Sequence, residues 1–171
     1  MVSVIIPTYN RASAIQKSVD SVLGQTYPDI EVIVVDDGSS DNTEEIVRQI
    51  PDGRVKYIRH TANRGACAAR NTGIKVSKGS YIAFQDCGDI WHREKLRKQL
   101  NIMEDTGADV TFCNMRKQGC EAGEKLPYRK GFINKEKNVI RIGTPVIAGK
   151  ASVFKEMQFN EKLPRLQDFE I

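Results

Sequence analysis

The sequence predicts an α/β protein in which a doubly wound, mostly parallel sheet carries helices on both faces, a Rossmann-like arrangement. Segments rich in valine and isoleucine alternate with segments of helical period, and turn residues separate them. The segment 30–35 is nearly all apolar, which is typical of a parallel strand covered on both faces. Alternating strands and helices call for parallel strands joined by right-handed crossovers.

The elements follow one another without an internal repeat. Strands are expected at residues 2–7, 30–35, 55–59, 81–85 and 109–113. Helices are expected at residues 14–23, 41–50, 66–76 and 91–103. The second helix has an N-cap and an acidic first turn at 41–44, which stabilise a helix start.

The pattern changes after residue 113. Residues 115–138 are rich in charge and glycine and have no clear period, so we expect a long loop or a β-excursion. A short strand is expected at 143–147, a helix at 152–157 and the start of another helix at 166–171. No capping residue closes this last helix. The sequence is therefore expected to form a single domain over residues 1–171 that is incomplete at its C-terminus.

Composition limits the class of protein. The chain has 171 residues, 40% of them hydrophobic and 28% charged, which fits one globular domain and not a disordered or fibrous chain. A net charge of +4 is compatible with anionic small molecules or an anionic membrane surface. No dense lysine and arginine run alternates with aromatic residues, so the sequence does not predict a nucleic-acid groove.

Targeting and cysteine signals favour a cytoplasmic protein. The N-terminus has no basic region of a signal peptide, and no apolar stretch reaches the roughly 20 residues of a membrane span. The four cysteines form neither a CxxC pair nor a dense disulfide scaffold, so reduced thiols are expected. Two isolated histidines, His60 and His92, are expected at element edges and not as metal ligands.

One helix carries a group of basic residues that we interpret as a solvated face. Its apolar residues recur at helical spacing, while the basic residues lie elsewhere on the helix. The basic residues are Arg93, Lys95, Arg97 and Lys98.

Polar residues follow four of the predicted strands. They lie at residues 7–11, 36–40, 63–65 and 86–89. Each group alone is common turn chemistry. Ligands of an open parallel sheet bind beyond the carboxyl ends of its strands, so four such groups on one edge predict a binding site.

The residue types at this edge suit a nucleotide. The Asp37 carboxylate can accept a hydrogen bond from a uracil imide, and Thr8 and Tyr9 can offer a hydroxyl and a stacking face. Asp86 and Asp89 flank a glycine-containing turn and could hold a divalent cation through oxygen ligands. A departing diphosphate needs such neutralisation as charge builds on its oxygens.

The ordered set of motifs resembles the family 2 glycosyltransferases, over nearly the whole chain. The matching segments are residues 2–10, 31–41, 63–65 with 69–73, and 79–86. The resemblance implies the GT-A fold and an inverting, hexosyltransferase-like enzyme. Such an enzyme moves a monosaccharide from a nucleotide-diphosphate sugar, here a UDP-sugar, to a hydroxyl of a glycan or lipid-linked acceptor. Bacterial polysaccharide biosynthesis in the cytoplasm, at the inner face of the membrane, is the setting it implies.

The resemblance also implies site residues. The nucleotide-sugar-binding residues would be Pro7, Thr8, Tyr9, Asn10, Asp36, Asp37, Arg70 and Asp86. Asp86 would be the first acid of the DxD motif, which binds Mn²⁺ or Mg²⁺. The second acid is replaced by Gly88, and Asp89 follows one residue later. Either Asp89 reaches the cation, as the pliable glycine turn favours, or metal dependence is weaker than usual.

The expected catalytic base is Asp168. Inversion needs a carboxylate that deprotonates the acceptor hydroxyl opposite the leaving nucleotide. Family members carry an acidic pair after the DxD motif, and Gln167-Asp168 occupies that place with the aspartate kept. An acid that only stabilises a helix N-terminus is the alternative. Gly143-Thr144-Pro145 matches a family segment expected to shape the sugar pocket.

Three other functions were weighed against the sequence. A nucleotide-sugar-binding module without catalysis stays open, because Gly88 replaces one acid. A phosphoacceptor domain is disfavoured, because its acidic pair would follow the first strand and Asp36-Asp37 follows the second. A dinucleotide oxidoreductase is disfavoured, because no GxGxxG follows the first strand.

Overall fold

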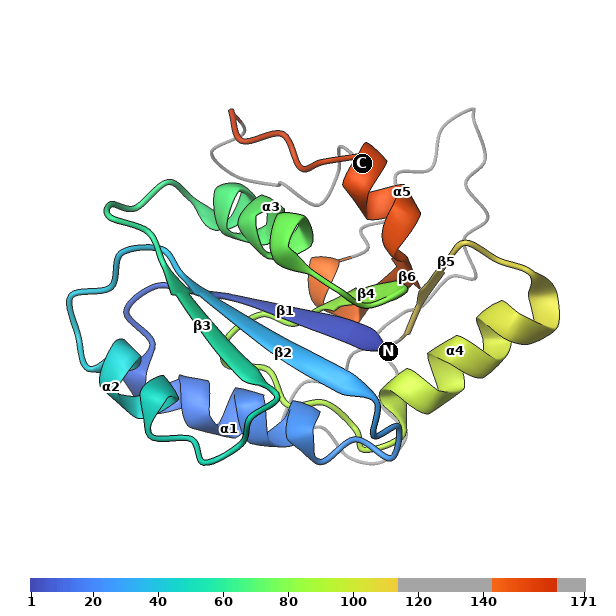
Figure 1. Cartoon of the computed structure of the whole chain (residues 1–171), viewed down its shortest axis with the longest axis horizontal. Coiled ribbons are helices and arrows are strands. Elements are labelled where there is room, and N and C mark those ends of the chain that lie inside the picture. The colour runs from blue at the N-terminus through green and yellow to red at the C-terminus, as the bar shows by residue number, and fades with distance from the viewer. Residues whose placement is uncertain (114–142, 163–171) are drawn as a thin grey trace.

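The computed structural model describes residues 1–113 and 143–162 (Figure 1). Its strands form one six-stranded sheet in the order β3-β2-β1-β4-β6-β5. The strands are β1 (Val2–Thr8), β2 (Ile30–Asp36), β3 (Val55–Arg59), β4 (Tyr81–Phe84), β5 (Val110–Phe112) and β6 (Ile147–Lys150). Strands β1 to β4 pair in parallel, and β6 runs antiparallel to both of its neighbours. The predicted mostly parallel sheet is confirmed.

Helices cover both faces of this sheet, as predicted. They are α1 (Ala12–Leu23), α2 (Thr43–Arg48), α3 (Ala66–Val76), α4 (Lys95–Thr106) and α5 (Ala151–Glu156), with one 3₁₀ turn η1 (Thr144–Val146). In Figure 1, α1 and α2 lie on one face, while α3 and α5 lie on the other. Apolar residues of α4 join the cluster that α1 and α2 form with the sheet.

The side chains of β1 show how the two-faced core follows from the sequence. Val2, Val4 and Ile6 join the cluster under α1, whereas Ile5 joins the cluster under α3. Successive residues of a strand point to opposite faces, so a continuous apolar run supplies both cores at once. All seven residues of β1 are buried.

The segment expected as a strand at 143–147 is corrected by the structure. It forms the 3₁₀ turn η1, and the strand β6 begins only at Ile147. Pro145 explains the difference, because proline has no N–H to donate to a sheet ladder but is tolerated in the first turn of a helix. The expected elements at 115–138 and 166–171 lie outside the described residues.

The predicted solvated face of α4 is wrong for Lys95. Its neighbours Arg93, Arg97 and Lys98 are exposed, but Lys95 is 8% exposed. Its ammonium group lies 3.8 Å from the centre of the Trp91 ring and donates to Gln99 Oε1 at 2.8 Å. Trp91 itself precedes α4 and is buried. The cation is thus paired with an aromatic face and an amide, contacts that spacing alone did not reveal.

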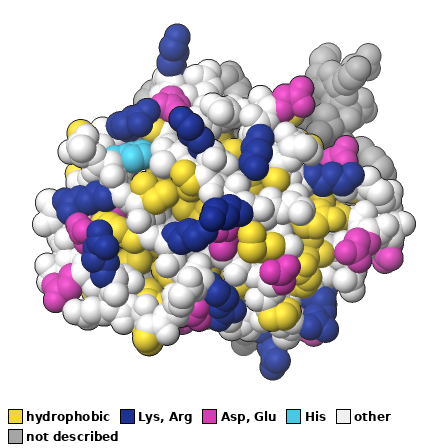
Figure 2. Space-filling model, in the orientation of Figure 1, with side chains coloured by type: hydrophobic (Ala, Val, Ile, Leu, Met, Phe, Trp, Pro, Cys, Tyr) yellow, Lys and Arg dark blue, Asp and Glu magenta, His cyan; other side chains and the backbone are white. Residues whose placement is uncertain are grey.

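The distribution of charged side chains on the surface agrees with the sequence, which has no dense run of basic residues. Figure 2 shows lysine and arginine side chains spread over one face, with acidic side chains among them and no single basic stripe. Among the described helices, none is both long and apolar enough to cross a membrane.

A tight turn before β4 yields a first prediction. A Cβ at Gly79 would lie 2.7 Å from the Ser3 nitrogen and 2.8 Å from the Met1 oxygen, both backbone atoms. We expect Gly79→Ala to lower the free energy of unfolding by about 1–3 kcal/mol, because the backbone must shift. Urea denaturation measures this. Gly53→Ala is the matched control, since nothing lies within 4 Å of its Cβ, and an equal loss in both variants would contradict the explanation.

Buried Lys95 yields a second prediction. Burial lowers its pKa from 10.5 to about 8, so the unfolded chain binds more protons between these values. Stability contributed at this site should therefore rise with pH across that window and be lowest below it. Urea denaturation of the wild type and Lys95→Met at pH 7 and pH 10 tests this. The wild type should gain stability relative to the variant at the higher pH, and a constant difference would contradict it.

Candidate functional site

A cavity of about 420 Å³ lies at the edge of the sheet where the parallel strands end. Residues from the loops after β1, β2, β3 and β4 and from the start of α3 line it. They are Pro7, Thr8, Tyr9, Arg11, Asp37, Asn63, Gly65, Ala66, Ala69, Arg70, Asp86 and Cys87. The prediction that the four polar loops meet at one edge is confirmed.

Backbone register brings these loops together. Thr8, the last residue of β1, pairs with Asp36 at the end of β2, and Asp36 pairs with Arg59 at the end of β3. Two further backbone bonds continue the alignment past the strands, from the Asp37 N–H to the Thr8 carbonyl and from the His60 N–H to the Asp36 carbonyl, each 2.8 Å long. The loops therefore begin at the same level.

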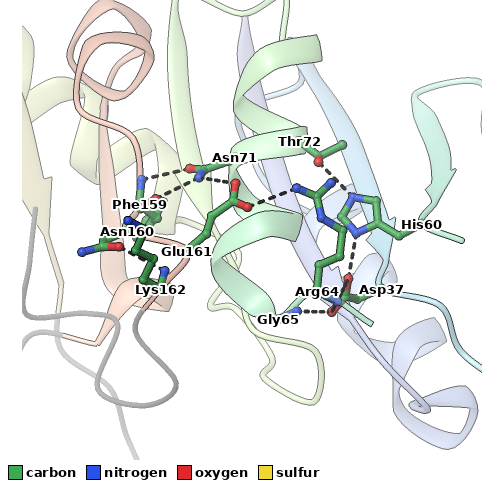
Figure 3. Close-up of polar contacts among 10 residues, drawn as sticks. All are labelled: Asp37, His60, Arg64, Gly65, Asn71, Thr72, Phe159, Asn160, Glu161 and Lys162. Carbon is green, nitrogen blue, oxygen red and sulfur yellow. Dashed lines mark hydrogen bonds and ion pairs between the residues drawn. The ribbon is translucent and has the colours of Figure 1, made fainter. Parts of the chain in front are cut away.

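Asp37 is the most constrained acid of the cavity. Its side chain is 4% exposed and accepts hydrogen bonds from three N–H groups (Figure 3). His60 Nδ1 lies 2.7 Å from Oδ1, the Arg64 amide lies 3.0 Å from both oxygens, and the Gly65 amide lies 2.6 Å from Oδ2. The carboxylate is thus held in one orientation at the cavity wall.

Two of the residues expected to bind the nucleotide do not line the cavity. Asp36 is fully buried and accepts from the Ser39 amide and the Tyr57 hydroxyl. Burial and this carboxylate raise the pKa of Tyr57. The Asn10 side chain accepts from the Ser40 amide at 2.8 Å. Both side chains therefore bond within their loops. Asp36 and Asp37 differ because successive residues leaving a strand point in opposite directions, and only Asp37 faces the cavity.

Arg70 and Asp86 form another part of the cavity wall. The Arg70 guanidinium is buried, donates to Asp86 Oδ1 at 2.9 Å and lies 5.4 Å from the centre of the Phe159 ring. Asp86 is 44% exposed, so its carboxylate also faces the cavity. A cation and an exposed acid side by side can contact a diphosphate and a metal ion, respectively.

The turn after Asp86 differs from the expected metal site. Gly88 adopts a φ of 114°, and Asp89 is absent from the cavity lining. The Asp89 carbonyl accepts from Gln85 and Ser18, which fixes the turn. Burial and the charge of Asp86 raise the pKa of Asp89. Among residues 1–113 and 143–162, no three potential metal-binding side chains lie together as a site.

Thr8 and Cys87 are neighbours in the cavity lining. The Thr8 hydroxyl is buried and has no oxygen or nitrogen partner among the described residues. It interacts with the Cys87 thiol, and burial raises the pKa of that thiol. A hydroxyl can both donate and accept, so Thr8 keeps hydrogen-bonding capacity for a ligand. Tyr9 lies at the same wall and is 46% exposed.

A clamp joins the segment after α5 to α3. The buried Asn71 side chain exchanges two hydrogen bonds of 2.9 Å with the Phe159 backbone and donates to Glu161 at 3.0 Å. Glu161 also pairs with Arg64 at 3.1 Å (Figure 3). The clamp holds the Phe159 ring under Arg70 and so connects a late segment of the chain with the cavity wall.

Sequence reasoning missed several of these residues. His60 lies at the end of β3, as expected, but its contact with Asp37 was not predicted. Ala66 and Ala69 lie outside the predicted polar groups but line the cavity. For His60 a signal existed, because it follows β3 at the same edge as the other polar loops. No sequence pattern indicated the clamp, because its partners are 88 residues or more apart in the chain. Asp168 lies outside the described residues.

The fold and cavity define an α/β protein whose mostly parallel sheet carries, at its strand ends, a cavity with a buried arginine beside an exposed carboxylate. A family model, Glycosyl transferase family 2, matches residues 3–161. The chain therefore belongs to glycosyl transferase family 2, as its motifs predicted.

Individual relatives agree with this. The chain is 45% identical over 114 residues to WfgD of Escherichia coli, a UDP-Glc:alpha-D-GlcNAc-diphosphoundecaprenol beta-1,3-glucosyltransferase. This match covers 67% of the chain and 45% of the relative. The chain is likewise 40% identical over 114 residues to the putative teichuronic acid biosynthesis glycosyltransferase TuaG of Bacillus subtilis, covering 66% and 45%. The matched part thus spans less than half of these relatives.

Solved structures confirm the GT-A-type fold. TarS 1-349 of S. aureus in complex with UDP-GlcNAc superposes with a TM-score of 0.80 at 25% identity, covering 98% of this chain and 50% of TarS. The mannosyltransferase PcManGT of Pyrobaculum calidifontis, in complex with GDP-Man and Mn²⁺, has a TM-score of 0.73 at 23% identity, covering 95% and 48%. The second likeness shows the fold alone.

The clamp yields a third prediction. Asn71→Asp would replace a donor by a carboxylate oxygen facing the Phe159 carbonyl and the Glu161 carboxylate. We expect a loss of about 1–3 kcal/mol in the free energy of unfolding, because buried acceptors lose their donor. Urea denaturation measures the loss. Asn42→Asp is the control, since Asn42 precedes α2 without a side-chain capping bond, and a loss no larger than in this control would argue against the clamp.

Proposed function

We propose that this protein is an inverting glycosyltransferase that moves a monosaccharide from a UDP-sugar to a hydroxyl of a glycan or lipid-linked acceptor. The observation that carries the proposal is the shared cavity, where Asp37 and Asp86 face the same space in a family 2 chain. UDP-GlcNAc is bound by TarS, and WfgD is named for transfer from UDP-Glc to a lipid-linked sugar. The cytoplasmic side of a membrane is the setting that such an acceptor implies.

The wall around Asp37 would bind the nucleoside. Its carboxylate is fixed by three N–H donors and can accept one more from a base. The Thr8 hydroxyl, which has no oxygen or nitrogen partner among the described residues, can bond to the ribose or the base, and the half-exposed Tyr9 ring offers a stacking face. Pro7 completes this wall with an apolar surface.

The wall around Arg70 would bind the diphosphate. Arg70 is pre-oriented by Asp86 and the Phe159 ring, so its guanidinium can meet phosphate oxygens at little entropic cost. Asp86 offers an exposed hard oxygen, which fits Mn²⁺ or Mg²⁺ bound by one carboxylate and substrate phosphates. When bound, the cation would neutralise charge on the leaving diphosphate. Asp89 would join it only after a rotation of the Gly88 turn.

Transfer with inversion needs a base on the opposite side of the sugar. We assign this role to Asp168, which follows the clamped segment by a few residues and can take the acceptor proton as its oxygen attacks the anomeric carbon. The C1–O bond to the diphosphate breaks in the same step, and UDP leaves. Without such a base the site would bind but not transfer, which is the second candidate function.

Calorimetric titration with UDP, with and without Mn²⁺, tests the binding half of this proposal. We expect UDP to bind and the cation to strengthen binding, because it links Asp86 to the diphosphate. Asp86→Asn should remove most of the gain from Mn²⁺. Absence of UDP binding under both conditions would exclude the proposed function.

A sugar-transfer assay tests catalysis. Asp168→Asn should lower turnover by a factor of about 100 or more, since general base catalysis typically contributes that much. UDP affinity should not change. Turnover equal to the wild type would remove Asp168 from the mechanism, and UDP binding without any transfer by the wild type would favour the binding module.

A further inference from the structure

His60 connects the cavity acid to the middle of α3. Its ring is 8% exposed, its Nδ1 lies 2.7 Å from Asp37 Oδ1 and its Nε2 lies 2.9 Å from the Thr72 hydroxyl (Figure 3). The three residues come from the ends of β2 and β3 and from α3. A buried imidazole with both nitrogens engaged has a fixed position and a fixed orientation.

The contacts define which nitrogen carries the proton. The amides of Arg64 and Gly65 can only donate, so the Asp37 carboxylate acts as an acceptor toward all its partners. His60 Nδ1 must then carry hydrogen, and in the neutral ring Nε2 accepts from the Thr72 hydroxyl. The result is a one-directional chain from Thr72 through His60 to Asp37.

This chain leaves Asp37 with accepting capacity toward the cavity. A carboxylate has about four lone-pair sites, and three N–H groups share this one, the Arg64 amide lying 3.0 Å from both oxygens. The carboxylate also lines the cavity, so a remaining site is open to a ligand. That site accepts and cannot donate as long as the three protein donors stay in place.

We propose that His60 and Thr72 are positioning residues that set the base selectivity of this cavity, by keeping Asp37 an oriented, acceptor-only group. A base with a ring N–H, such as uracil, donates a hydrogen bond to the Asp37 carboxylate. Cytosine presents a ring nitrogen lone pair at the same position and is repelled. The inference rests on the proposed function, because it assigns the Asp37 wall to the nucleobase.

Loss of His60 would reduce the preference for UDP over CDP more than it would reduce the affinity for nucleotides in general. Without the His60 donor, Asp37 Oδ1 loses one of its partners, and the carboxylate can turn away from the orientation that favours uracil. A residue that only supported the fold would instead change the affinities for all nucleotides by the same factor. The ratio of UDP affinity to CDP affinity therefore separates a positioning role from a structural one.

The test measures UDP and CDP dissociation constants by calorimetry for the wild type, His60→Ala, His60→Asn and Thr72→Val. We expect the wild type to prefer UDP by about fivefold or more, since a buried polar group left unpaired costs about 1 kcal/mol or more. His60→Ala should reduce the preference to about threefold or less, and Thr72→Val should reduce it by a smaller factor. His60→Asn should recover part of it, because its amide N–H can reach the position of Nδ1.

Three controls make the result decisive. His92→Ala removes the other, exposed histidine and should keep the wild-type ratio. UDP methylated at the uracil ring nitrogen should bind the wild type as poorly as CDP. Thermal unfolding checks that each variant is folded, and His60→Asn and Thr72→Val keep the test valid if His60→Ala does not fold.

Two outcomes overturn different claims. A UDP-to-CDP ratio that stays at the wild-type value in folded His60 and Thr72 variants would refute the positioning role and leave the proposed function intact. A wild type that binds no UDP would refute the proposed function and this inference with it.

Discussion

The parallel register of β1 with its two neighbours is the constraint on which the rest of the site depends. It aligns Thr8 with Asp36 on one side and Ile5 with Phe84 on the other. The loops after β1 and β2 then begin at the same level of the sheet, whereas the loop after β4 begins level with Ile5. Because both faces of the sheet are covered by helices, the register is held by two hydrophobic clusters at once, and a slip of one residue would exchange them.

Two adjacent acids show how this edge separates support from binding. Asp36 ends β2, is fully buried and fixes its own loop through Ser39 and Tyr57. Asp37 leaves the strand in the opposite direction and reaches the cavity, where the loop after β3 supplies its donors. Asp36 makes the turn rigid, and this rigid turn holds the Asp37 carboxylate in one orientation toward the cavity.

The second wall depends on contacts from the far end of the chain. Phe159 packs edge-on against Phe84 with ring centres 5.3 Å apart and lies beneath Arg70, while Asn71 holds its backbone. The guanidinium and Asp86 are oriented as a consequence.

The sequence alone determined the fold class, most element positions and the family, because apolar periodicity and strand-end motifs are local signals. It also located the four loops, because the carboxyl ends of parallel strands meet by topology. Tertiary structure decided which of two neighbouring acids faces the cavity, that His60 supports Asp37 and that Lys95 is buried against Trp91. These outcomes depend on side-chain direction and on partners distant in the chain, which neither residue spacing nor motif identity contains.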